Sequence, residues 1–411
     1  MKKNTAIATA FVASVALLLS GCAVSTTGPS NDSLSSLKIG WLLPQTGPIS
    51  SLGAPQIAAL KLAAEDIAAG GGPKISYTGG DEAGDTAAAG QAVDRMLAAH
   101  VSAIIGAGSS SITLSVIDKI TGSGTLECSG MNTTPALTGY PDKGLYFRTV
   151  PSDVLQGGVL ADKIKADGGK SVAIISRSDS YATGLADATV TSLEHAGVNV
   201  ATRVDYDPSA TNLDAEVRKV VSSKPDSIIL FSFDEGATIL QSLIQAGYGP
   251  DKVKLYGTDA LPIASLAKTV DPSNPAILKG MTFTQASSGE GTAFTKRLLQ
   301  KDPGLSTTAF SPYFYDCAVL IALGAEKAKS TDSSAIAGEL VGLTNGDKKC
   351  TDYAQCKKLI DAGDSVQYVG AAGPLKFDKE GEPTTGLYDI LVMNADGTTS
   401  TAATVRRTIE K

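Results

Sequence analysis

The chain has 411 residues, of which 19% are charged and 43% hydrophobic, and it carries a formal net charge of −7 with an isoelectric point near 5.0. This length allows two domains with ordinary hydrophobic cores. Neutralising phosphate requires clustered cations, and this acidic chain has no long run of Lys or Arg. We therefore expect no nucleic-acid partner.

The first 21 residues are typical of a lipoprotein signal peptide. Two lysines precede an apolar run over residues 6–19, which is too short for a stable transmembrane helix. The run closes on Leu-Ser-Gly-Cys at residues 19–22, which matches the bacterial lipobox and predicts acylation of Cys22. The alternative is an ordinary secretory signal with a chance cysteine. Residues 22–36 are rich in Ser, Thr, Gly, Pro and Asn, which predicts a flexible tether.

From residue 38 to residue 256 the sequence alternates short apolar runs with helical patterns. Strands are expected at residues 39–43, 75–77, 101–105, 125–129, 171–175, 198–204, 227–231 and 253–256. Helices are expected at residues 57–67, 86–99, 112–119, 153–166, 182–196, 214–221 and 237–246. Such alternation predicts an α/β fold with parallel sheets covered on both faces. The two series divide near residues 147–151, so we expect two doubly wound parallel-sheet lobes.

The end of the sequence departs from that alternation. Residues 312–329 and 334–343 have helical patterns, whereas residues 350–356 are polar and predict a loop. A turn-rich segment at residues 373–381 precedes a final apolar strand at residues 388–393. These features predict a β-hairpin or meander at the end of the chain.

Four cysteines remain once Cys22 is set aside, an even number in a chain expected to be exported. Cys350 and Cys356 are close enough for a local disulfide, which would leave Cys128 and Cys317 to form a long-range one. A zinc site built from all four thiolates is the alternative, although the spacing does not suit paired zinc knuckles. We expect disulfides and no metal.

Residues 106–111, Gly-Ala-Gly-Ser-Ser-Ser, connect an expected strand to an expected helix. Such a junction directs backbone N–H groups and the positive end of the helix dipole at one point, which predicts an anion site. The segment lacks the third glycine of GxGxxG and the lysine of a P-loop, so no nucleotide cofactor is expected. Hydroxyls and amides suit a carboxylate better. The alternative is that the serines only cap the helix.

Three further loops follow expected strands and carry polar or aromatic residues. They contain Thr133, Tyr181 and Asp259. Ligands of open α/β sheets bind beyond the carboxyl ends of the strands, so these loops can share one cleft. Hydroxyls facing a carboxylate suit a zwitterion, with Asp259 accepting the ammonium group. Each residue also has a structural explanation: Tyr181 as a helix-start aromatic, and Asp259 as an Asx-turn residue.

Six segments in order resemble the leucine/isoleucine/valine-binding family of ABC-transporter solute receptors, which have the type I periplasmic binding fold. They are TGPISSLG at 46–53, GSSS at 108–111, TTPALT at 133–138, YATGLA at 181–186, YGTD at 256–259 and GPLKFDKEG at 373–381. The resemblance covers residues 38–396 and implies two lobes joined by a hinge of several crossings, expected near residues 147–151, 280–286 and 368–374. The first lobe is expected to comprise residues 37–150 and 285–368, and the second residues 151–284 and 369–411.

The resemblance also implies roles for individual residues. Ser109 would hold the ligand carboxylate through its amide and hydroxyl, beside Ser110, and Thr133 would do likewise. Tyr181 would cover the ligand, and Asp259 stands where the family has an acidic residue for the α-ammonium group.

Other positions depart from the family pattern or are less firmly matched. Phe310 would line the side-chain pocket. Leu52 stands where family members often carry an aromatic residue in the first loop. Near residue 232 the match needs a gap, so either Phe233 or nothing replaces the usual aromatic residue. Asp234 is a second possible carboxylate, which would favour a more basic or hydroxylated ligand.

These expectations describe a monomeric, lipid-anchored receptor on the extracytoplasmic face of the cell membrane. Hinge closure over an amino acid or similar small carboxylate would precede docking on an ABC permease. The alternative is a sensor of the same fold that presents its ligand to a membrane signalling receptor. No cofactor is expected, and no enzyme activity, because neither His100 nor His195 lies in a strand-end loop and no catalytic motif is present.

Overall fold

The computed structural model describes residues 34–262, 265–289 and 292–409. The signal peptide expected at residues 1–21, the lipidation site Cys22 and the expected tether up to residue 33 lie outside these residues. Everything described below belongs to one unit, Ser33–Lys411.

A five-stranded parallel sheet forms the centre of the first lobe, in the order β2-β1-β3-β4-β5. Its strands are β1 (Ser36–Leu43), β2 (Lys74–Asp81), β3 (Ala103–Gly106), β4 (Leu126–Ser129) and β5 (Tyr146–Arg148). The helices of this lobe are α1 (Gly53–Ala69), α2 (Thr86–Ala98), α3 (Ser110–Gly122), α9 (Ala293–Lys301), α10 (Ser311–Ala328), α11 (Ser333–Thr344) and α12 (Tyr353–Asp361).

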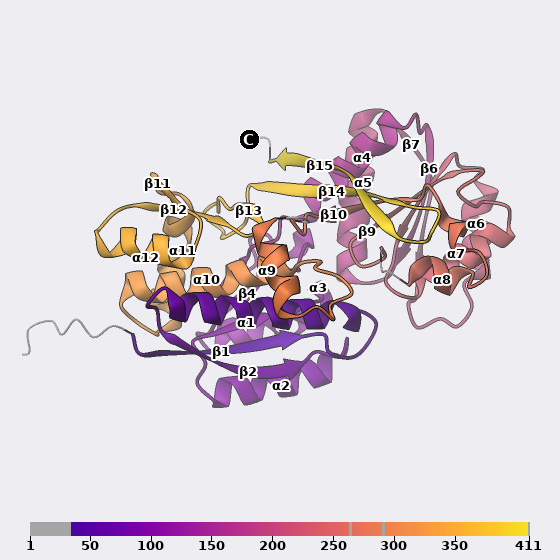
Figure 1. Ribbon diagram of the computed structural model, residues 1–411. Helices are drawn as coiled ribbons and strands as arrows, with labels where there is room; N and C mark the ends of the chain where they lie inside the picture. The colour runs from indigo at the N-terminus through magenta and orange to yellow at the C-terminus, as the bar shows by residue number, and fades with distance from the viewer. Residues whose placement is uncertain (1–33, 263–264, 290–291, 410–411) are drawn as a thin grey trace, which may run out of the picture. The chain divides into compact units, whose positions relative to one another are not determined.

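Both faces of this sheet are buried, as alternate residues of its strands show. Ile104 of β3 packs with the apolar residues of α2 and α3, whereas Ile105 packs in the larger core that contains α1 and α10. Figure 1 shows α1 and α2 on opposite sides of β1 and β2. Strands buried on both faces are expected to read as continuous apolar runs. This explains why β3 is visible in the sequence.

A seven-stranded sheet forms the centre of the second lobe, in the order β15-β14-β10-β9-β8-β6-β7. Its strands are β6 (Ser171–Arg177), β7 (Asn199–Tyr206), β8 (Ser227–Phe231), β9 (Lys254–Thr258), β10 (Thr282–Ala286), β14 (Thr385–Met393) and β15 (Thr399–Thr408). Only the pairings of β14 with β10 and β15 are antiparallel. The helices are α4 (Asp153–Ala166), α5 (Ser180–Ala196), α6 (Asp214–Ser222), α7 (Gly236–Gln245) and α8 (Leu266–Val270).

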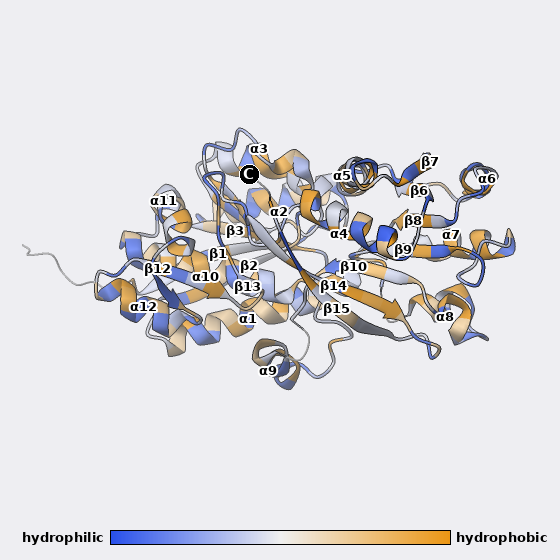
Figure 2. Cartoon of the chain, turned by 90° about the horizontal axis from the view of Figure 1, so that it is seen from above, coloured by the Kyte–Doolittle hydropathy of each residue, from blue (hydrophilic) through white to orange (hydrophobic). Residues whose placement is uncertain are grey.

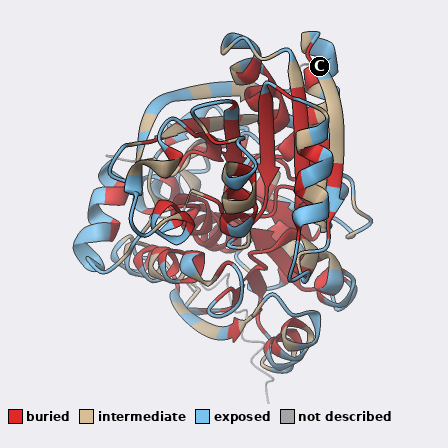
Figure 3. Ribbon diagram, turned by 90° about the vertical axis from the view of Figure 1, so that its right-hand side faces the viewer, coloured by how far each residue is buried: buried red, intermediate tan, exposed pale blue. Residues whose placement is uncertain are grey.

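The remaining elements are short. A small third sheet contains β11 (Lys348–Cys350), β12 (Val366–Gly370) and β13 (Gly373–Pro374), and 3₁₀ turns occupy Ser50–Leu52, Pro135–Leu137 and Pro275–Leu278. The helices that cover the sheets carry apolar and polar faces (Figure 2), and their outer faces are exposed while the central strands of each sheet are buried (Figure 3). This is the pattern of a layered α/β protein.

The structure confirms the predicted α/β class with two lobes built on mainly parallel sheets. The bounds of α4 and β8 agree with the prediction residue for residue, and the β14–β15 hairpin confirms the expected hairpin ending. The strand expected to be the final one, at residues 388–393, is however followed by β15. Two further local predictions are wrong. Residues 282–286 form β10 inside the second sheet, so the second crossing follows them. The polar segment 350–356 ends in α12, which begins at residue 353 because Asp352 caps it. The residue boundaries of the two lobes remain a prediction.

The structure contains both expected disulfides, which removes the alternative zinc site. Cys128 of β4 is bonded to Cys317 of α10 with 5.9 Å between their Cα atoms, and Cys350 is bonded to Cys356 with 5.2 Å. The first disulfide therefore fixes the long buried helix α10 against the central sheet of the first lobe.

A buried arginine lies where the chain first crosses between the lobes. The guanidinium of Arg148, fully buried, donates hydrogen bonds to the carbonyl oxygens of Asn132 and Thr134 and to the Glu382 carboxylate at 2.6 Å. Glu382 lies between β13 and β14. The loop after β4 is thus held by an arginine whose charge is neutralised by the Glu382 carboxylate. Across the described residues, no helix combines the length and apolarity needed to cross a membrane.

Candidate functional site

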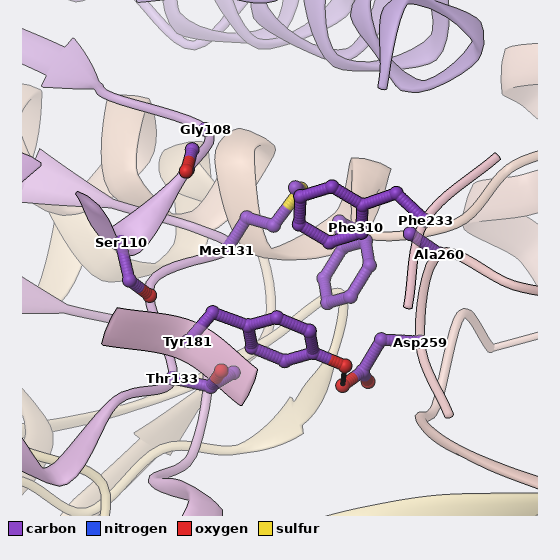
Figure 4. Close-up of a pocket in the computed structure, with 10 residues that line it drawn as sticks. Gly108, Ser110, Met131, Thr133, Tyr181, Phe233, Asp259, Ala260 and Phe310 are labelled. Atoms are coloured by element: carbon purple, nitrogen blue, oxygen red, sulfur yellow. Dashed lines mark hydrogen bonds between the residues drawn. The ribbon is translucent and has the colours of Figure 1, made fainter. Parts of the chain in front are cut away.

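A cavity lies where loops of both lobes meet (Figure 4). It is lined by Gly108, Ser109, Ser110, Met131, Thr133, Tyr181, Phe233, Asp259, Ala260 and Phe310. Nine of these ten residues follow the carboxyl ends of β3, β4, β6, β8 and β9, which is where open parallel sheets bind ligands. Phe310, in contrast, precedes α10. The topology therefore gathers residues that are as much as 200 positions apart in the sequence.

Most of the residues predicted from the sequence line this cavity. They are Ser109, Ser110, Thr133, Tyr181, Phe233, Asp259 and Phe310. Leu52 lines a neighbouring cavity, which shares Asp259 and Ala260 with the first. Asp234 is exposed, lies in the loop just before α7 and lines neither cavity.

The serine turn forms the first wall of the cavity, and its amides already hold an anion. The N–H of Gly108 donates to Glu82 Oε2 at 2.7 Å, and the N–H of Ser109 donates to Glu82 Oε1 at 3.1 Å. Glu82 is fully buried at the end of β2, and burial raises the pKa of its carboxyl group to about 7, although these two hydrogen bonds lower it. The Ser109 amide is therefore occupied by the protein itself.

What the first wall offers to a ligand is mainly hydroxyl groups. Ser109 is the N-cap of α3, yet its side chain makes no capping hydrogen bond. The Ser110 amide is the first of α3, and no acceptor for it occurs among the described residues. The side chain of Thr133 lies on the same wall, and its hydroxyl group is buried. Free N–H groups at a helix start favour a negatively charged ligand group.

Asp259 forms the second wall, with its carboxylate held by two donors. The Tyr181 hydroxyl donates to Asp259 Oδ2 at 2.7 Å, and Gln156 Nε2 donates to Oδ1 at 3.1 Å. The backbone of Asp259 has a positive φ of 46°, a conformation that Asp and Asn tolerate better than most residues. Burial raises the pKa of Asp259 to about 6, although the two hydrogen bonds lower it. Asp259 is therefore mostly ionised at neutral pH and can accept a cationic group.

A second buried acid, Asp153, lies close enough to Asp259 to be influenced by its charge. Burial first and the charge of Asp259 second raise the pKa of Asp153 well above its ordinary value, which favours the neutral acid. The two neighbouring acids are therefore not both ionised, and Asp259 is the anionic group of this wall.

Aromatic rings complete the second wall. The ring of Phe233 stacks on that of Tyr181 with 5.5 Å between centroids and 15° between planes. The guanidinium carbon of Arg177 lies 3.8 Å from the centroid of Phe233, and Nη1 of Arg177 donates to Glu235 Oε1 at 2.7 Å. Figure 4 shows Phe310 and Met131 beside these rings. The cavity thus combines polar groups for the two ends of a zwitterion with an apolar surface for its side chain.

The sequence analysis did not identify Met131 as a residue that lines the cavity. It also did not identify Glu82 and Gln156, which bond to residues that line it. Met131 lies in the strand-end loop that contains Thr133, so that loop could have identified it. Glu82 directly follows β2, but the strand expected there ended at residue 77, so the prediction did not place this acid at a strand end. Gln156 lies one turn into α4 and carries no such signal.

The histidines lie away from the cavity. His100 follows α2 and His195 lies in the last turn of α5, both exposed. Among the described residues, no group of three or more His, Cys, Asp and Glu side chains is arranged to hold a metal ion.

Comparison with known proteins places this architecture in a family. The sequence profile described as "Periplasmic binding protein" matches residues 36–398. The chain belongs to this family. It is 27% identical over 342 residues to a Leu/Ile/Val-binding protein homologue of Brucella melitensis, covering 78% of this chain and 86% of that protein. It is also 27% identical over 371 residues to a chemotactic signal transduction substrate-binding protein of Halobacterium salinarum, covering 85% of each.

Solved structures of this periplasmic binding family share the fold. A leucine-binding protein of Thermotoga maritima superposes with a TM-score of 0.76 at 20% identity, over 90% of this chain and 98% of that one. A solute-binding protein of Rhodopseudomonas palustris in complex with 4-hydroxybenzoate gives a TM-score of 0.73 at 18% identity, over 90% and 97%. The resemblance stated from the sequence motifs is thereby confirmed at the level of family and fold.

Proposed function

We propose that this periplasmic binding protein is a lipid-anchored, monomeric receptor on the extracytoplasmic face of the membrane. It binds an amino acid or a similar small carboxylate between its lobes and delivers it to an ABC permease. The observation that carries the proposal is the pairing of two unlike walls in one cavity: hydroxyls and a helix start on one side, and the Asp259 carboxylate on the other. Relatives named as Leu/Ile/Val-binding proteins support the amino-acid class.

The two walls can be tested with three compounds that share one side chain. L-Leucine carries both charged groups, 4-methylpentanoate lacks the ammonium group, and isoamylamine lacks the carboxylate. A ligand that prefers the native state raises the melting midpoint of the chain. We expect L-leucine to raise it and both analogues to raise it less at equal concentration. A stronger response to 4-methylpentanoate than to L-leucine would redirect the proposal to simple carboxylates.

The lipid anchor is tested separately in a bacterial host that processes lipoproteins. The wild-type chain should enter the membrane fraction and incorporate labelled palmitate. Cys22→Ser should do neither, because the thiol is the acylated group. Equal membrane association of the two chains would contradict the anchor without affecting the ligand site.

A sensor function is the second candidate, and the similarity to the chemotactic substrate-binding protein of Halobacterium salinarum favours it. Deleting the gene distinguishes the two functions. A transport receptor is required for uptake of labelled L-leucine, whereas a sensor is required for a behavioural or transcriptional response while uptake continues.

A further inference from the structure

The first residue of α5 is held by side chains of the opposite lobe. The N–H of Ser180 donates to Ser111 Oγ at 3.1 Å, and the Thr134 hydroxyl donates to the carbonyl oxygen of Ser180 at 2.8 Å. Ser111 belongs to α3 and Thr134 to the loop after β4, both in the first lobe, whereas α5 belongs to the second. Both backbone polar groups of one residue are thus bonded across the cleft.

The next turn of the same helix approaches the first lobe closely. A Cβ atom added to Gly184 would lie 2.7 Å from Thr134 Oγ1 and 2.8 Å from Pro135 Cδ. Gly184 has no positive φ, so only this approach requires a glycine. The helix therefore fits against Thr134 only because the side chain is absent.

None of these residues lines the cavity, but three are sequence neighbours of residues that do. Ser111 follows Ser110, Thr134 follows Thr133, and Ser180 precedes Tyr181. In each pair one residue faces the cavity and the other faces the opposite lobe. The same movement of the lobes therefore closes the cavity on a ligand and forms these bonds.

We propose that Ser111, Thr134 and Gly184 form a closure clamp on the first turn of α5, which sets ligand affinity without contact with the ligand. The inference rests on the proposed binding function. These are positioning residues. Their contacts across the cleft exist only when the lobes are together, so they stabilise the closed form relative to the open form. In the open form, water replaces both hydroxyl partners, as at any exposed helix start.

The clamp predicts how binding changes in three variants. Ser111→Ala and Thr134→Val should each weaken binding of L-leucine about 2- to 10-fold, the effect of one net hydrogen bond. Gly184→Ala should weaken it about tenfold or more through overpacking of the closed form. The loss should be in the dissociation rate, because the contacts form after the encounter.

Matched controls exist in helices of both lobes. Ser115 lies one turn further along α3, and its hydroxyl bonds to Ile112 O of the same helix; Thr191 of α5 likewise bonds to Asp187 O. Gly338 of α11 has open space around an added Cβ atom. Ser115→Ala, Thr191→Val and Gly338→Ala should leave the affinity for L-leucine unchanged. Because alanine favours helices, we expect Gly184→Ala not to lower the melting midpoint of the free chain. An unlowered midpoint excludes misfolding as the cause of weaker binding.

Lobe closure itself is measured by pulsed electron paramagnetic resonance between spin labels at exposed Gln91 of α2 and exposed Lys219 of α6. The wild-type chain should populate a short distance that Gly184→Ala depletes and Gly338→Ala retains. If L-leucine does not bind the wild type, the proposed ligand class fails, but the distance experiment still tests the clamp. A wild type without the short distance, or a Gly184→Ala chain that keeps it, would overturn the clamp.

Discussion

The two walls of the cavity neutralise their polar groups in different ways. On the first wall, the backbone amides of Gly108 and Ser109 are bonded to the internal carboxylate of Glu82, which leaves mainly hydroxyls for a ligand. On the second wall, the Asp259 carboxylate keeps its charge, and Tyr181 and Gln156 only orient it. The comparison teaches that a helix start in a strand-end loop need not be free for a ligand, and that the second wall should contribute more to affinity.

The largest effect is therefore expected from Asp259→Asn. Asparagine keeps the left-handed backbone at this position, removes the charge and replaces one of the two acceptor oxygens with an NH₂ group. An α-ammonium group left without a buried partner should cost about 3 kcal/mol or more, which is at least a hundredfold in affinity for L-leucine. Calorimetric titration of both chains measures this loss. An unchanged titration would remove Asp259 from the site, and binding of 4-methylpentanoate serves as the control because it should persist.

Glu82→Gln tests whether the internal anion of the first wall is a buried titratable group. The pKa of Glu82 is raised from 4.5 to about 7, so the folded chain favours the protonated acid. The wild type therefore loses stability as pH rises from about 4.5 to 7, by about 3 kcal/mol from this group, and a glutamine loses none. Relative to the wild type, the Glu82→Gln chain should therefore gain about 3 kcal/mol in unfolding free energy as the pH rises over this range. Urea unfolding at pH 4.5 and 7.5 measures it, and a constant difference would contradict the assignment.

On both walls the sequence predicted most of the lining residues and missed the groups that support them. Tyr181, Thr133 and Asp259 each follow an apolar run that identifies a strand, and the rule for parallel sheets then brings their loops together. Glu82 was missed because the strand expected at residues 75–77 ends before it and because its role depends on bonds to amides 26 and 27 positions away. Asp234 was proposed from an alignment with a gap, and its side chain is exposed.

The fold shows the same division between local and distant signals. Apolar strands such as β8 are visible because both faces of the sheet are covered. In contrast, β10 carries the sequence Thr-Phe-Thr-Gln-Ala, and its burial depends on pairing with β14 about one hundred residues later. The sequence of α12 is polar enough to suggest a loop, and its helix is fixed by the Asp352 cap. Such elements require the tertiary partner to be known.

Acid pH should separate the contributions of the two walls. The pKa of Asp259 is about 6 in the ligand-free chain, so only about a tenth of the carboxyl groups are ionised at pH 5. Since the ionised form holds the ammonium group, affinity for L-leucine should fall about tenfold between pH 7 and pH 5. Binding of 4-methylpentanoate, which lacks that group, should not show this fall. Calorimetric titrations at pH 5, 6, 7 and 8 compare the two, and parallel curves would contradict the assignment of the ammonium to Asp259.

The smallest effect is expected from Ser109→Ala on the first wall. The amide of Ser109 stays bonded to Glu82 in this variant, and the hydroxyl makes no capping bond whose loss would destabilise α3. Affinity for L-leucine should fall about 2- to 10-fold, as for one net hydrogen bond, while the melting midpoint of the free chain stays the same. The opposite result, a lower midpoint with unchanged affinity, would show that Ser109 serves the helix start and not the ligand. In that case the hydroxyl of Thr133 and the free amide of Ser110 would be the remaining donors of this wall.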